Sequence, residues 1–153
     1  MDEIIFKALA ANAGEAVIEV HNISCIDAPE QETFDFITDG LFSYSPQEIF
    51  LSYLETDVTG IPGTVTTIRI RPDEVELSRE GAITSTMEFK KGGKDNILYN
   101  TPYGTATMGL RTRSLTQSFD ENGGSLEVDY VLDFEHAMVL HNQINVKVTK
   151  QKN

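Results

Sequence analysis

Two stretches near the C-terminus alternate between apolar and polar side chains, and this period of two constrains the fold more than any other feature. The pattern covers residues 125–134 and returns in residues 138–149. Successive side chains of a β-strand point to opposite faces of a sheet, so each stretch predicts a strand with one buried face and one solvent-exposed face. The predicted buried sets are Leu126, Val128, Tyr130, Leu132 and Phe134, and Met138, Leu140, Ile144, Val146 and Val148.

Shorter runs upstream carry the same alternation, and turn residues such as Gly92-Gly93 and Asn122-Gly123-Gly124 separate the runs. Glycine and asparagine supply the positive φ angles that tight hairpins need. A flat sheet of such strands would leave two edges and one apolar face exposed. We therefore predict an all-β fold, a closed antiparallel meander barrel of about ten strands, with a β-sandwich as the alternative. The apolar positions of these runs are Phe34, Phe36, Ile68, Ile70, Val75, Leu77, Ile83, Met87 and Phe89.

The length of 153 residues fits one domain, and a domain of this size buries about two-thirds of the surface that its unfolded chain exposes. We expect residues 16–150 to form a single β-barrel domain. Residues 1–15 are expected to form a short N-terminal segment that either makes one or two helical turns or frays.

The charge balance excludes several classes of partner. Twelve basic residues against twenty-four acidic ones give a net charge of −12, which repels nucleic-acid phosphates and anionic lipid surfaces. No segment approaches the roughly twenty apolar residues that span a bilayer. We expect no nucleic-acid partner, no membrane partner and a cytoplasmic location. The single cysteine, Cys25, allows no intrachain disulfide, and we interpret it as a small packed hydrophobic residue.

The middle of the chain carries an ordered series of short motifs. The motifs are Leu51-Ser52-Tyr53-Leu54-Glu55, Thr66-Thr67-Ile68-Arg69-Ile70, Ser78-Arg79-Glu80-Gly81, Met87-Glu88-Phe89, Gly92 and Tyr99-Asn100-Thr101-Pro102-Tyr103-Gly104. In this order and spacing they resemble the YwiB-like family of small bacterial proteins of unknown function, over nearly the whole chain from about residue 16 onward. The resemblance implies a calycin-like β-barrel, related in shape to lipocalins, but no established activity and no catalytic residues.

Arg79 is the most informative single position, because it follows Val75 and Leu77 at steps of two and is therefore predicted to face inward. A lone buried guanidinium is unfavourable, so Arg79 needs a partner. Glu55 shares parity with Tyr53 and is a candidate. Two interpretations stay open: an internal ion pair that closes one mouth of the barrel, or an arginine that recognises an anionic ligand inside it.

Three further polar positions form a second candidate element. Tyr99, Thr101 and Tyr103 share a face at steps of two, and Pro102 marks a strand end, edge or bulge. Phenol rings with an apolar body and a polar tip suit the rim of a pocket. The alternative is a tight corner between two strands, set by Pro102 and Gly104, with the tyrosines packed against a neighbouring strand.

Catalytic and metal-binding motifs are missing from the sequence. No Gly-x-Ser-x-Gly elbow or phosphate-cradling glycine motif occurs, and His21, His136 and His141 have no zinc-ligand spacing. We expect no cofactor, no metal and no enzyme activity. The predicted function is binding of a small amphipathic or anionic ligand inside the barrel. The alternative is a non-catalytic protein-interaction module or a structural module that self-associates as a homodimer, because residues 48–54 are apolar on both faces.

Overall fold

The computed structural model describes residues 14–26, 31–55, 63–101, 104–134 and 138–151, and its ten elements are all β-strands. This confirms the predicted all-β fold. Within these residues there is no helix of the length and apolarity that crossing a bilayer requires. The strands are β1 (Gly14–Ile26), β2 (Gln31–Tyr44), β3 (Ile49–Leu54), β4 (Val65–Ile70), β5 (Glu74–Glu80), β6 (Ser85–Lys90), β7 (Lys94–Thr101), β8 (Gly104–Asp120), β9 (Gly123–Phe134) and β10 (Met138–Lys150).

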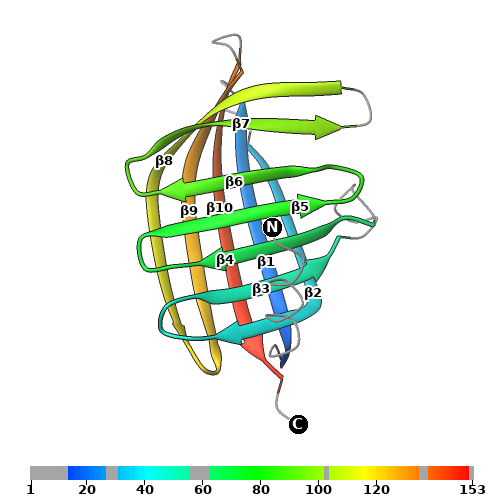
Figure 1. The fold of residues 1–153 in the computed structure, drawn as a ribbon, viewed down its shortest axis with the longest axis vertical. Helices are drawn as coiled ribbons and strands as arrows, with labels where there is room; N and C mark the ends of the chain where they lie inside the picture. Colours follow the sequence, from blue (N-terminus) through cyan, green and yellow to red (C-terminus); the bar gives the residue numbers. More distant parts are fainter. Residues whose placement is uncertain (1–13, 27–30, 56–62, 102–103, 135–137, 152–153) are drawn as a thin grey trace.

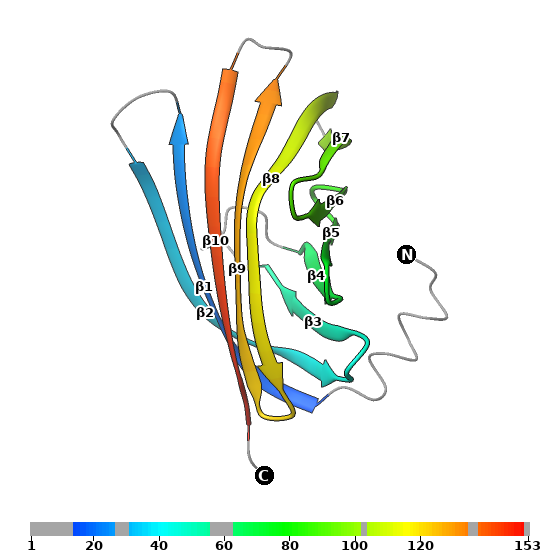
Figure 2. The same ribbon diagram turned by 90° about the vertical axis from the view of Figure 1, so that its left-hand side faces the viewer.

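The strands form one antiparallel sheet in the order β6-β5-β4-β3-β2-β1-β10-β9-β8-β7. The long strands β1, β2, β8, β9 and β10 make one wall, and the shorter strands β3 to β7 cross in front of it (Figure 1). Seen from the side, the two walls enclose the interior of a barrel (Figure 2). The first and last strands pair along nearly their whole length, from Ala16 opposite Lys150 to Ile26 opposite Leu140.

The barrel has one seam, between β6 and β7. These strands are consecutive in the chain and lie next to each other, but no hydrogen-bonded ladder joins them in the described part of the chain. Their turn instead bonds to β8: Gly92 N–H donates to the Thr112 carbonyl at 3.3 Å, and Thr112 N–H donates to Gly93 at 3.1 Å. The register of β8 shifts between Thr112 and Ser114. The predicted closed meander is therefore a nearly closed barrel.

Most of the predicted inward side chains are buried, and those of Phe134 and Met138 lie outside the described residues. Val75, Leu77, Leu126 and Val128 are each at most 4% exposed. The rings of Phe89 on β6 and Tyr130 on β9 lie 4.9 Å apart, so they join the two walls across the interior. Phe36 from the predicted set is only partly buried, and the interior is not fully packed beside it.

Strand β3 is buried on both faces, as its sequence predicted. Phe50 on one face is 1% exposed and Leu51 on the other is 0% exposed. This burial exists within a single chain, so no second subunit is required to cover Phe50.

Candidate functional site

A row of polar side chains crosses the inner face of the short wall. Tyr53 of β3 lies opposite Thr66 of β4, Thr66 lies opposite Arg79 of β5, and Arg79 lies opposite Ser85 of β6. Directly opposed residues in an antiparallel sheet project from the same face, so the four side chains form one transverse row. Two residues further along the strands, the same face is apolar: Ile68, Leu77 and Met87 form the next row, and all three are buried.

Glu55 joins this row from just beyond the end of β3. Its N–H donates to the Thr64 carbonyl at 2.7 Å, which continues the β3–β4 pairing past Leu54. The step of two from Tyr53 then directs the Glu55 side chain inward, where it is 4% exposed. Thr64 is itself fixed, since its hydroxyl oxygen accepts a hydrogen bond from Ala82 N–H at 3.1 Å.

A cavity of about 220 Å³ lies against this row inside the barrel. Three of its lining residues, Tyr53, Glu55 and Arg79, are predicted site residues, and the structure brings them together. Asn22 adds a polar group from β1 in the opposite wall. The rest of the lining is apolar: Val20, Phe34, Phe36, Ile68, Leu77, Ile144 and Val146. The cavity is therefore lined by polar side chains on one part of its wall and by apolar side chains on the rest.

The polar groups of the cavity are incompletely satisfied. Thr66 Oγ1 donates to Glu55 Oε1 at 2.6 Å, but Glu55 Oε2, Arg79 Nε and Asn22 Oδ1 are buried without a hydrogen-bond partner. Among the described residues, no ion pair joins Arg79 to Glu55. The interpretation of Arg79 as half of an internal ion pair with Glu55 is therefore wrong. Such orphaned buried groups are costly and call for an explanation.

Tyr53 supplies a protonated hydroxyl at the edge of this set. Burial raises the pKa of Tyr53 above its usual value of 10, and the charge of Glu55 raises it further, against the opposing effects of Arg79 and Thr66. The hydroxyl of Thr66, which lies opposite Tyr53, donates to Glu55 Oε1.

The second predicted element is only partly visible. Tyr99 and Thr101 belong to β7, but their side chains lie outside the described residues, as does the whole of Tyr103. Sequence reasoning missed Asn22 and Thr66. Both could have been found by extending the inward parity, since Asn22 follows Val20 by two and Thr66 precedes Ile68 by two.

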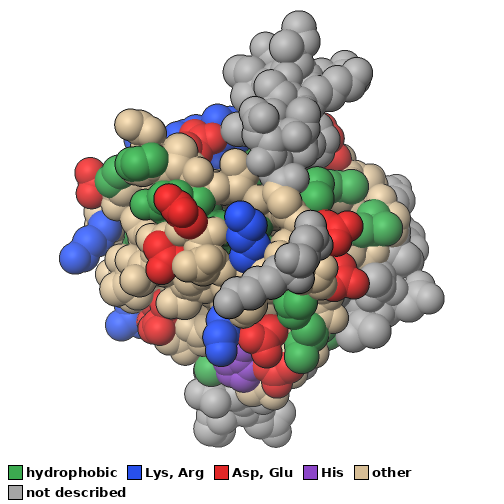
Figure 3. Space-filling model, turned by 90° about the horizontal axis from the view of Figure 1, so that it is seen from below, with side chains coloured by type: hydrophobic (Ala, Val, Ile, Leu, Met, Phe, Trp, Pro, Cys, Tyr) green, Lys and Arg blue, Asp and Glu red, His purple; other side chains and the backbone are tan. Residues whose placement is uncertain are grey.

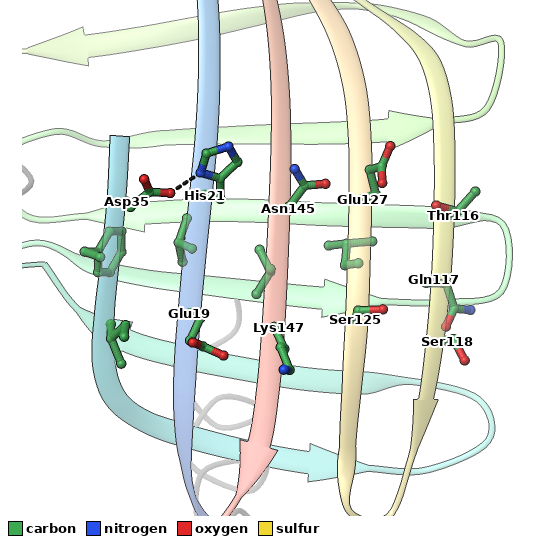
Figure 4. A pocket seen from close by; sticks show the side chains of 15 residues that line it. Glu19, His21, Asp35, Thr116, Gln117, Ser118, Ser125, Glu127, Asn145 and Lys147 are labelled. Carbon is green, nitrogen blue, oxygen red and sulfur yellow. Dashed lines mark hydrogen bonds and ion pairs between the residues drawn. The ribbon is translucent and has the colours of Figure 1, made fainter. Parts of the chain in front are cut away.

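A larger hollow of about 680 Å³ lies on the outer face of the long wall. Figure 4 shows its polar lining in two rows that run across β2, β1, β10, β9 and β8. His21 Nδ1 pairs with Asp35, and Gln143 donates to Glu127 at 2.9 Å. His21 and Asp35 are 42% and 69% exposed. His21, Asp35 and Glu127 are already paired and are exposed to solvent. The outer hollow is therefore a weaker candidate for a binding site than the interior cavity.

A charge network stands on the outer face of the short wall. Glu48 accepts hydrogen bonds from Arg69 Nε at 2.8 Å and from Arg71 Nε at 3.1 Å, and Arg71 also pairs with Glu74. Burial alone would raise the pKa of Glu48, but the hydrogen bonds and charges of both arginines bring it below its ordinary value of 4.5. The network is separate from the cavity lining.

Elsewhere on the described surface, a hollow of about 330 Å³ is lined by charged side chains that include Lys94, Asp95 and Arg111. No group of three or more potential metal ligands is found within the described segments. On the face shown in Figure 3, acidic side chains lie beside lysines and arginines, and the hydrophobic ones occur in separate small groups.

Comparison with known proteins agrees with this architecture. The chain is 27% identical over 117 residues to the uncharacterised β-barrel protein YwiB of Bacillus subtilis, covering 76% of this chain and 81% of YwiB. The crystal structure of that Bacillus protein superimposes with a TM-score of 0.82 and 19% identity, over 96% of this chain and 99% of the other. The profile of the DUF1934 family, a domain of unknown function, matches residues 18–146. The chain, a nearly closed ten-stranded barrel, therefore belongs to the DUF1934 family.

Proposed function

We propose that this chain is a cytoplasmic, calycin-like binding protein that holds a small amphipathic ligand in its interior cavity. One observation carries the proposal: Arg79 Nε and Glu55 Oε2 are buried against the same cavity and neither has a partner. An arginine that served only to close the barrel would be expected to neutralise a carboxylate directly. A ligand with an anionic group would satisfy Arg79, and its apolar part would contact Phe36, Ile68 and Leu77.

The cavity volume limits the size of the ligand. An apolar cavity of roughly 150 Å³ accommodates benzene, so about 220 Å³ admits a molecule only slightly larger. A long-chain lipid would place only part of its chain in this space, so the ligand class that we propose is a short molecule with one charged end.

Native mass spectrometry of the freshly purified full chain tests the proposal. We expect a small-molecule adduct on the wild-type protein, and we expect Arg79→Met to lose it. Arg113→Met is the matched control, because Arg113 is solvent-exposed on β8. A wild-type chain that carries no adduct, together with an organic extract of the denatured protein that contains no stoichiometric small molecule, would refute the proposal.

The alternative of an interaction module has less support. Its motive was an apolar outer face on residues 48–54, and Phe50 on that face is buried within one chain. The homodimer stays a prediction for light scattering to test.

A further inference from the structure

We infer that the ligand of this cavity is zwitterionic at its polar end, as in an apolar α-amino acid. The inference rests on the proposed binding function and specifies the class of molecule. The cavity offers a buried cationic donor, Arg79 Nε, and two buried acceptors, Glu55 Oε2 and Asn22 Oδ1, none of which has a partner. A molecule that satisfies all three must accept one hydrogen bond and donate at least two.

Charge balance points to the same class. A simple carboxylate would neutralise Arg79 but would bring a second negative charge next to the buried Glu55. Like charges in a partly desolvated site repel, because the surroundings screen them less than water does. A simple amine would meet Arg79 with the same disadvantage. A carboxylate and an ammonium group on one carbon match the charges of Arg79 and Glu55, and the molecule stays neutral overall.

The two acceptors line the same cavity from opposite walls of the barrel. Glu55 projects from the short wall just beyond β3, and Asn22 projects from β1 in the long wall. Thr66 already occupies Oε1 of Glu55, so Oε2 is the oxygen left for the ligand. The hydroxyl of Ser85, which lies opposite Arg79, is also buried without a partner. It can therefore donate or accept a further hydrogen bond.

The apolar lining selects a short hydrocarbon side chain. Val20, Ile68, Leu77, Ile144 and Val146 supply the aliphatic part of the cavity lining. Branched aliphatic residues of this kind pack well against a branched aliphatic ligand. The volume of about 220 Å³ accommodates an amino acid of the size of leucine, since roughly 150 Å³ already holds benzene.

Three probes with the same hydrocarbon part separate the contributions. Leucine carries both charges, 4-methylpentanoate lacks the amine, and 3-methylbutylamine lacks the carboxylate. We expect leucine to bind the full chain in a calorimetric titration at neutral pH, and each of the other probes to bind at least about tenfold more weakly. In Glu55→Gln, the affinity for leucine should fall by about tenfold, while the affinity for 4-methylpentanoate should not fall. Glu19→Gln, on the outer face, is the control and should change neither.

The outcomes separate this inference from the proposed function. If 4-methylpentanoate or 3-methylbutylamine binds the wild-type chain as tightly as leucine, the zwitterionic class is refuted and the binding function stands. If no probe binds and the native mass spectrum shows no adduct, both are refuted. The comparison of probes on the wild-type chain decides the question even if Glu55→Gln does not fold. A native adduct whose mass and fragmentation show no amine would also refute the inference.

Discussion

Arg79 and Glu55 line one cavity inside the barrel without forming an ion pair with each other. Each keeps a buried polar atom without a partner, Nε in the arginine and Oε2 in the glutamate. Natural proteins rarely leave such atoms unsatisfied, because each costs about 1–3 kcal/mol. The pair therefore distinguishes this interior from an ordinary packed core.

Substitution of Arg79 separates a structural from a binding role. We expect Arg79→Met to change the free energy of unfolding by less than about 1 kcal/mol, because the guanidinium has no ion pair to lose and methionine fills similar space. Urea denaturation measures this change. A loss of about 3 kcal/mol or more would show that Arg79 is a structural residue after all.

Arg69→Met provides the matched control for that experiment. Arg69 donates two hydrogen bonds to Glu48, at 2.8 and 3.1 Å. The same chemical change should here cost about 1–3 kcal/mol, because charge-assisted hydrogen bonds are lost.

The charge network on the short wall predicts how stability responds to acid. The folded pKa of Glu48 lies below its ordinary value of 4.5, so the unfolded chain takes up this proton first as the pH falls. Glu48 therefore stabilises the fold above about pH 4.5, and this contribution is lost as the pH drops through the folded pKa. At pH 7 we expect Glu48→Gln to cost about 1–2 kcal/mol.

Urea unfolding of the wild type and Glu48→Gln at several pH values measures this effect. The difference between the two should shrink as the pH falls below 4.5. Glu121→Gln, in the exposed β8–β9 turn, should show no such dependence. A wild-type-to-variant difference that stays constant down to acidic pH would contradict the assignment.

Gly40 permits the close approach of β1, β2 and β3 near the cavity. A Cβ atom there would lie 2.6 Å from the Ser52 carbonyl oxygen and would collide with the end of Ile18. We expect Gly40→Ala to destabilise the fold by about 1–3 kcal/mol. Gly109→Ala is the control, because its added Cβ would meet nothing nearer than Asp133 at 3.7 Å. Thermal unfolding of both variants provides the test, and equal losses would count against the packing explanation.

The seam predicts uneven hydrogen exchange. Within the described sheet, β4 is paired on both sides, whereas β6 pairs with β5 alone and β7 with β8 alone. Amides of β6 and β7 that face the seam lack a ladder partner, so we expect them to exchange at least roughly tenfold faster than the amides of β4. Amide exchange followed by NMR measures this directly. Uniform protection across β6 and β7 would mean that the seam is closed in solution.

Much of the fold follows from the sequence, because the period of two specifies which side chains are buried in each strand. Leu126 and Val128 are correctly placed inward on that basis, and so are Arg79 and Glu55. The seam was not predictable, since β6 alternates as regularly as its neighbours and the alternation carries no information about which edges pair. Closure through β1 and β10 depends on long-range register.

The site was predictable in its members but not in its contacts. Parity places Tyr53, Glu55 and Arg79 on the inner face, but the separation of two inward side chains also depends on the twist of the sheet and on neighbours. Thr66 intervenes between Glu55 and Arg79 by holding one carboxyl oxygen. Asn22 comes from the opposite wall, and no local pattern indicates which residues meet across a barrel.

The position of the seam gives the chain the connectivity of a circularly permuted meander. Read from β7 through β10 and on from β1 to β6, every ladder joins strands that would be consecutive. Among the described strands of the natural chain, the β1–β10 ladder is the one that links the two segments, and Gln151 N–H donates to the Glu15 carbonyl at one end of it. Pairing distant segments carries a high loop-closure cost and slows folding. Joining the end of β10 to the start of β1 and cutting the chain between Gly92 and Gly93 would remove that cost. The permuted chain should therefore fold to the same barrel faster.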